Sequence, residues 1–222
     1  MTATTIRPED KAVASEEISQ PTAPVVKIRR RTVDTVLVWS GLVVAVVLAA
    51  AGALLQWGNN FAGDYVYDEL SSQQIFFPDE AALTGQGRDD LVKYAGEQVT
   101  TGDEAEAYAS YIDGHLEETA GGLTYAQLGA PEREAQAAVT EATEAGAPQA
   151  EIDELQATAD EITGQRNTLF KGETLRGLLL SAFAWDTVGE VAGIAAMVAF
   201  AGAAVMLVMV IMGVVHLRRL HS

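Results

Sequence analysis

The chain of 222 residues contains no cysteine. This absence excludes disulfides, thiolate catalysis, and zinc or iron–sulfur sites with cysteine ligands, so packing alone must hold the fold together. Histidine is nearly as scarce, because only His115 lies away from the C-terminal end. Zinc and iron sites usually take two or more histidine or cysteine ligands. We therefore interpret His115 as a surface or core residue, with a role in metal binding as the alternative.

The sequence also has few of the motifs that carry catalysis or ligand binding. No G-x-S-x-G nucleophile motif and no D-x-[DN]-x-[DN]-G calcium loop is present. The glycines Gly85 and Gly87 lack the strand context and the lysine of a phosphate-binding loop, so they predict a turn. The six tyrosines could line a small-molecule pocket, but tyrosines at helical spacing favour a half-buried core. We predict no catalytic, cofactor-binding or metal-binding residues.

Positive charge is scarce in the middle of the chain. Between Gly58 and Glu190 there are 26 acidic and six basic residues, a difference of about 20 negative charges. Such a segment repels nucleic acid and anionic lipid headgroups. We interpret it as a solvated acidic surface, with binding of divalent cations as the alternative.

Two long apolar runs stand on either side of this acidic segment. They predict transmembrane helices at residues 33–57 and 187–217, each long enough to cross a bilayer. The first run is too long for the apolar core of a signal peptide, so it reads as a retained signal anchor. Four basic residues between Lys27 and Arg31 precede the first run, and Arg218 and Arg219 follow the second.

By the positive-inside rule, these charges place both termini in the cytoplasm of a multi-pass cell-membrane protein. Contact between the basic cluster and anionic lipid is favoured over a role in nucleic-acid binding. The predicted organisation is a disordered cytoplasmic tail at 1–32, an acidic extracytoplasmic domain at 58–186, and a cytoplasmic end at 218–222.

Small residues recur along both predicted spans and allow close helix packing. The stripe on the first span consists of Gly41, Ala45, Ala49 and Ala53, and that on the second of Gly189, Gly193 and Ala196. We expect the two spans to pack on each other; self-association or docking on a larger membrane complex is the alternative.

Helical periodicity without strand-like alternation predicts an all-α domain between the spans. Helices are expected to follow Asp79, over residues 88–99, from Thr101 to about Thr119, and from Pro131 to Gly146. From Ile152 onward, apolar steps of three and four predict a helical hairpin that continues into the second span. If this helix is unbroken to Leu217, it spans roughly 100 Å.

The charged segment just before the second span is the predicted neck of the molecule. Its candidate functional residues are Lys171, Glu173, Arg176 and Trp185. We expect the two cations to bind carboxylates from the helices near Trp57, which would make a structural clamp. A partner-docking surface with Arg176 as its anchor is the alternative. Trp57 and Trp185 are expected to mark one outer membrane interface.

Several strings, including LSSQQIFFP, LVKYAGEQV, EAYASYIDGHL, GLTYAQLGAPERE and LFKGETLRGLLLSAFAW, resemble an uncharacterised family of two-span actinobacterial membrane proteins. The resemblance covers about Val33 to the C-terminus and implies a Gram-positive envelope setting. Some members carry an aromatic ring-opening dioxygenase label. The residues do not support this label, because such an iron site needs two histidines and a carboxylate.

The sequence therefore predicts a non-enzymatic accessory, assembly or scaffold subunit whose outer domain meets an envelope or membrane partner. Its expected partners are membrane lipid and either another membrane protein or further copies of itself, and not nucleic acid. The alternative is an extracytoplasmic sensor or carrier that binds a ligand or a divalent cation.

Overall fold

The computed structural model describes residues 30–219. These residues form five α-helices and one 3-10 helix and contain no strand, which confirms the all-α prediction. In chain order the elements are α1 (Arg30–Ser72), α2 (Glu80–Gly85), η1 (Asp89–Tyr94), α3 (Gly102–Thr119), α4 (Gly129–Glu144) and α5 (Gln149–Arg219). The predicted tail at 1–32 lies outside the described residues up to residue 29, and residues 30–32 already belong to α1. Residues 220–222 of the predicted C-terminal end also lie outside them.

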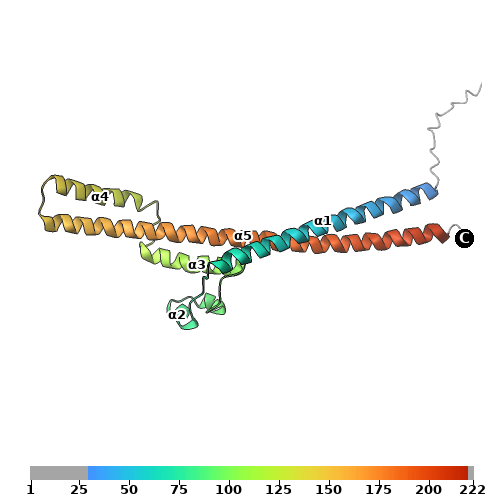
Figure 1. Ribbon diagram of the computed structural model, residues 1–222, viewed down its shortest axis with the longest axis horizontal. Helices are drawn as coiled ribbons and strands as arrows, with labels where there is room; N and C mark the ends of the chain where they lie inside the picture. The colour runs from blue at the N-terminus through green and yellow to red at the C-terminus, as the bar shows by residue number, and fades with distance from the viewer. Residues whose placement is uncertain (1–29, 220–222) are drawn as a thin grey trace, which may run out of the picture.

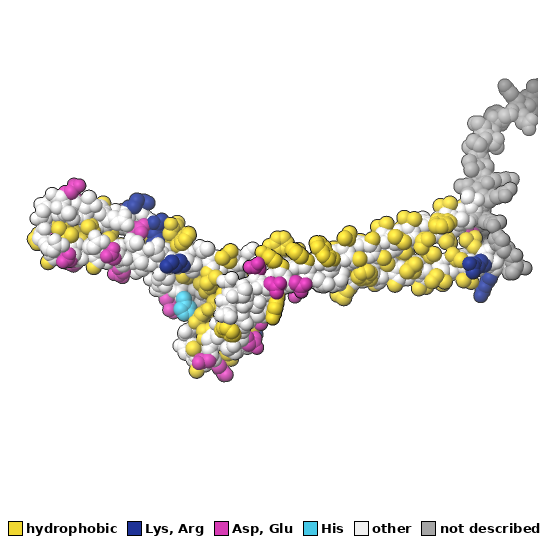
Figure 2. Space-filling view, in the orientation of Figure 1, with side chains coloured by type: hydrophobic (Ala, Val, Ile, Leu, Met, Phe, Trp, Pro, Cys, Tyr) yellow, Lys and Arg dark blue, Asp and Glu magenta, His cyan; other side chains and the backbone are white. Residues whose placement is uncertain are grey.

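The two longest helices, α1 with 43 residues and α5 with 71, form an antiparallel pair. Figure 1 shows α1 beginning at the end of the molecule where α5 finishes. Both are long and apolar enough to cross a membrane, judged by length and composition. Figure 2 shows hydrophobic side chains over the paired part and acidic side chains over the rest, which we call the arm (residues 58–186).

Glycines bring the backbones of α1 and α5 close together. A Cβ atom added at Gly189 would lie 2.8 Å from the Cβ of Ala62, and one added at Gly213 would lie 2.7 Å from a methyl of Val38. Real Cβ atoms do not approach this closely, so only glycine fits at these crossings without a shift of the neighbour. The buried residues Gly189, Ala196 and Ala203 recur every seven positions along α5. This interval is typical of a left-handed supercoiled pair.

Neither long helix ends at the predicted edge of its span. α1 continues from residue 57 to Ser72 because Ala62, Val66 and Leu70 are buried. α5 is continuous from Gln149 to Arg219, so the glycines within it do not break it. The predicted domain boundaries at 57/58 and 186/187 therefore fall inside unbroken helices.

The segment between α1 and α3 packs as a small module on α5. Phe77, Val99 and Leu179 lie in one buried cluster with residues of α1 and α3. The helix predicted over residues 88–99 is wrong: η1 covers only Asp89–Tyr94, and an extended segment follows. Gly96 has a φ of +73°, which ends helical geometry, and the Val99 N–H donates to the Ile75 carbonyl over 2.9 Å.

The free end of the arm is the predicted helical hairpin, formed by α4 and the start of α5. Gly146, with a φ of +69°, and Pro148 make the turn between the two helices. The Arg166 guanidinium forms an ion pair with Glu132 and stacks 4.2 Å above the Tyr125 ring. These contacts fix α4 and the loop before it against α5.

Candidate functional site

The neck is the level at which α3 and the end of α1 pack against α5. Arg176 of α5 forms ion pairs of 3.2 Å with Asp113 of α3 and with Glu173 on its own helix. The clamp therefore joins α5 to α3, and not to the helices near Trp57 as expected. Glu173 and Lys171 are exposed, and Lys171 forms no ion pair with any residue between 30 and 219.

Asp186 of α5 caps the beginning of α3. Its carboxylate accepts a hydrogen bond of 2.8 Å from the Gly102 N–H, and Thr101 and Glu104 add a capping box at the same helix end. A negative charge at a helix N-terminus is stabilised by the unpaired N–H groups and the helix dipole. A Cβ at Gly102 would lie 2.5 Å from the Asp186 Cβ, so the two backbones approach closely here.

A third contact joins α3 and α5 between Arg176 and the tip hairpin. Gly172 faces Leu116 so closely that an added Cβ would overlap the leucine side chain. Leu116 is itself buried with Ala120, Leu128 and Leu169, so it has little room to move. Together with the Asp186 cap and the Arg176 clamp, this contact braces α3 along α5; we call the three contacts the brace.

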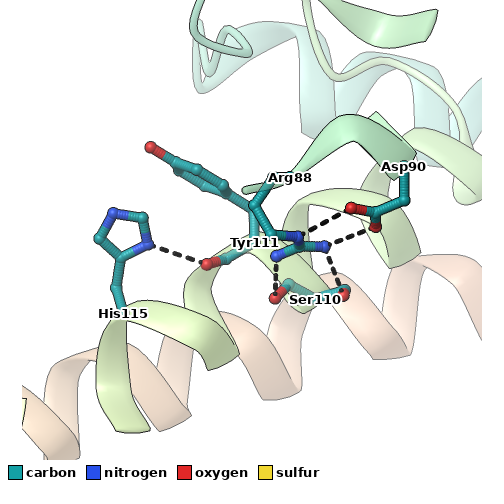
Figure 3. A network of polar contacts seen from close by, with 5 residues as sticks. All are labelled: Arg88, Asp90, Ser110, Tyr111 and His115. Atoms are coloured by element: carbon teal, nitrogen blue, oxygen red, sulfur yellow. Dashed lines mark hydrogen bonds and ion pairs between the residues drawn. The ribbon is translucent and has the colours of Figure 1, made fainter. Parts of the chain in front are cut away.

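A hydrogen-bond network holds η1 onto α3 (Figure 3). The Arg88 guanidinium donates to both carboxylate oxygens of Asp90, over 3.0 and 2.8 Å, and to the carbonyl and hydroxyl of Ser110, each over 2.9 Å. The bonds between Arg88 and Asp90 hold the pKa of the Asp90 carboxyl below its ordinary value. The same bonds raise the pKa of the Arg88 guanidinium.

His115 lies beside this network without joining it. Its Nδ1 atom is 3.0 Å from the Tyr111 carbonyl oxygen, and the His115 and Tyr111 rings are tilted by 60° to each other with centroids 4.5 Å apart. Within residues 30–219, no group of three or more histidine, aspartate or glutamate side chains is placed to hold a metal ion.

An apolar groove of about 310 Å³ lies between the end of α1 and the neck of α5. We call it the neck groove. Its α1 side includes Tyr65 and Glu69, and its α5 side includes Leu175, Leu178 and Trp185. Trp185 was predicted as a neck residue, and 53% of its surface is exposed. Sequence reasoning missed the groove, because only the packing register of α1 against α5 places these residues side by side.

The small-residue stripes are only partly at the helix crossing. Gly41 and Ala45 are buried, but Ala49 and Ala53 are exposed, and Gly52 takes the next position on the contact face. A spacing of four residues drifts around a helix of 3.6 residues per turn, whereas the contact face alternates steps of three and four. On α5, Gly189 and Ala196 are buried and Gly193 is half-buried.

The two tryptophans lie at different levels along the helix pair, and their shared membrane interface stays a prediction. Ala62 lies opposite Gly189. Trp57 precedes Ala62 by five residues, so it lies level with a point about five residues after Gly189 on the antiparallel helix. Trp185 lies four residues before Gly189, which separates the tryptophans by about nine residues, or roughly 13 Å.

Comparisons with protein families, curated proteins and solved structures give no match for this chain. The resemblance to an actinobacterial two-span family therefore stays a prediction from its sequence strings.

Proposed function

We propose that the chain is a non-enzymatic two-span membrane protein, an accessory or scaffold subunit that presents a braced helical arm to an envelope or membrane partner. The observation that carries this proposal is the continuity of α5, which runs without a break from the tip hairpin to the far end of the paired helices.

Exposure of the apolar helices supports placement in a membrane. In the most apolar window of each long helix, only 17% of the residues are buried within the chain. The core helix of a soluble protein would be mostly buried, so these side chains need another apolar surrounding, which lipid supplies. The packing of α1 on α5 along both spans supports retention of α1 in the mature protein.

Charge supports the orientation. α1 starts at Arg30, at the same end of the pair as Arg218 and Arg219. Basic residues at this end favour the cytoplasmic side, so the acidic arm lies outside the cell membrane. The first acidic residue on the arm side of the second span is Glu190, and α5 continues for about 40 residues from there to its tip. The arm therefore holds its tip hairpin roughly 60 Å above the membrane.

The brace supports a mechanical role for the arm. A single exposed helix of this length would bend, but α3 is fixed to α5 by the Asp186 cap, the Arg176 clamp and the Gly172 contact. A partner bound at the tip would therefore be held at a set height above the bilayer.

Site-directed labelling and co-purification test this function. A single cysteine in place of Ala145, an exposed residue at the tip turn, should react with a membrane-impermeant maleimide in intact cells. A cysteine in place of Ser222 should react only after permeabilisation. Gentle solubilisation should then recover a stable partner protein or further copies of the chain. Labelling of both positions from one side, or a strictly monomeric chain with no partner, contradicts the proposal.

The sensor or carrier alternative is tested by thermal melting. Specific binding of calcium, magnesium or lipid to the folded arm would raise its melting temperature, by an amount that grows with the logarithm of the ligand concentration above its Kd. An unchanged melting temperature with all three favours the scaffold.

A further inference from the structure

Two grooves flank the contact between α1 and α5 at the end of the molecule where α1 begins. Val38 and Val210 line both grooves, because they lie at the contact itself, against Gly213 and Gly41. One groove, of about 550 Å³, includes Asp34 and His216. The other, of about 520 Å³, we call the inner groove; its walls include Thr35, Trp39 and Leu42 of α1 and Val210, Val214 and Arg218 of α5.

The two grooves differ in charge. Arg218 is the one charged residue among the eight that line the inner groove, it is exposed, and it forms no ion pair with any residue between 30 and 219. The other groove contains the Asp34 carboxylate and no lysine or arginine. Figure 2 shows basic side chains at this end of the paired helices, where α5 finishes with Arg218 and Arg219. An anionic ligand at this end is therefore directed to the inner groove.

The length of the inner groove matches one leaflet of a bilayer. α5 advances eight residues from Arg218 to Val210, which corresponds to about 12 Å. One leaflet contributes roughly 15 Å to the hydrocarbon core. Trp39, which is 63% exposed, borders the groove, and tryptophan is enriched where a membrane meets water. A small soluble anion would leave the apolar walls uncovered, whereas an acyl chain covers them along their length.

We propose that the inner groove binds one phospholipid with an anionic headgroup, taken from the cytoplasmic leaflet. The inference rests on the proposed membrane placement. The Arg218 guanidinium donates charge-assisted hydrogen bonds to the lipid phosphate, and one acyl chain lies along Leu42, Val210 and Val214. A zwitterionic lipid carries the same phosphate, but the basic end repels its cationic amine or choline group. The groove therefore prefers an anionic lipid such as phosphatidylglycerol.

Quenching of Trp39 fluorescence measures occupancy of the groove. Phenylalanine in place of Trp57 and Trp185, both exposed, leaves Trp39 as the one tryptophan of the chain. The full chain is placed in phosphatidylcholine nanodiscs with a small fraction of phosphatidylglycerol, or of phosphatidylcholine, that has brominated acyl chains. Brominated phosphatidylglycerol should quench Trp39 at about fivefold lower mole fraction, which corresponds to about 1 kcal/mol for one arginine near an anionic lipid. Salt should reduce this preference.

Two variants with opposite expected outcomes test the role of Arg218. Arg218→Gln should abolish the preference for phosphatidylglycerol. Arg219→Gln is the matched control, because it removes the same charge from the next position of α5 but does not line the groove. It should keep most of the preference. An equal loss in both variants would show attraction to the basic end as a whole and overturn the site.

Filling the groove tests the acyl chain separately. Val214→Phe places a larger side chain in the groove and should lower quenching by brominated phosphatidylglycerol, whereas Val208→Phe, on an exposed face outside both grooves, should not. Equal melting temperatures of the two variants in detergent establish that both are folded. If Val214→Phe does not fold, the two arginine variants still decide the proposal.

Three other results would overturn the inference. Equal quenching by the two brominated lipids means that the groove holds ordinary surrounding lipid. No quenching by either lipid means that another helix covers Trp39. Loss of the preference when soluble glycerol phosphate is added means that the groove binds a free anion.

The labelling experiment separates this inference from the proposed function. If Ala145→Cys reacts from outside and Ser222→Cys only after permeabilisation, but Trp39 shows no lipid preference, the lipid site alone is refuted. If Ser222→Cys reacts from outside, the membrane placement fails, and binding from the cytoplasmic leaflet fails with it.

Discussion

Replacing Gly172 by alanine tests the brace between α3 and α5. Alanine normally stabilises an exposed helix position by about 1 kcal/mol relative to glycine. At Gly172, however, the new methyl would overlap Leu116, which is buried and packed on all sides. Overpacking of this kind costs about 1–3 kcal/mol, so we expect a net loss of about 1 kcal/mol from the free energy of docking α3.

Gly177→Ala is the matched control on the same helix. No atom lies within 4 Å of an added Cβ there, so only the gain in helix propensity applies. The two variants should therefore change stability with opposite signs, although the chemical change is identical.

Hydrogen exchange measured on peptides from α3 reads this difference directly. Gly172→Ala should speed exchange of the α3 amides about fivefold, because a change of about 1 kcal/mol shifts the opening equilibrium by this factor. Gly177→Ala should leave exchange unchanged or slower. Adding Leu116→Ala to the first variant should cost less than the sum of the two single changes, because the new methyl then occupies part of the vacated space. Protection of α3 that rises equally in both glycine variants would refute the brace.

Three further predictions follow from individual contacts. Asp186→Ala removes a helix cap and should lower the protection of the first turn of α3 by about 0.5–2 kcal/mol in hydrogen exchange, with the rest of the helix less affected. Because Arg88 lowers the pKa of Asp90, this ion pair stabilises the fold above the unfolded pKa of about 4 and is lost as pH falls through the lower folded value. The parent protein should therefore lose under about 1 kcal/mol of its free energy of unfolding from this pair between pH 6 and pH 3, a small amount because the carboxylate is exposed. In Asp90→Asn this contribution to the pH dependence should be absent when thermal melts at the two pH values are compared. Gly189→Leu should separate α1 from α5 and lower the melting temperature in detergent, whereas Ala53→Leu, on an exposed face, should not.

Local signals in the sequence identified the helix ends where side chains or glycine control the backbone. Asp79 caps α2 as predicted, α3 starts at the predicted position with Thr101 as its cap, and Gly146 marks the turn of the hairpin. These features depend only on residues within one turn of each other, so they can be read without knowledge of the fold.

Features that depend on distant residues could not be read in this way. The partner of Arg176 is Asp113, and the cap of α3 comes from Asp186, 84 positions away from Gly102. The sequence contains many other carboxylates, and nothing local distinguishes these two. Likewise, the polar residues after Trp57 indicate the end of a span, but burial against α5 keeps α1 helical to Ser72.

The most direct test of the account is a distance along the arm. Spin labels at Ala157→Cys and Ala184→Cys, both exposed on α5, are separated by 27 residues, which corresponds to roughly 40 Å in a continuous helix. Pulsed electron resonance on the protein in lipid nanodiscs, diluted with unlabelled chain, should give one narrow distribution near that distance. A broad distribution, or a maximum well below it, would show that the arm bends and would contradict its role as a rigid spacer.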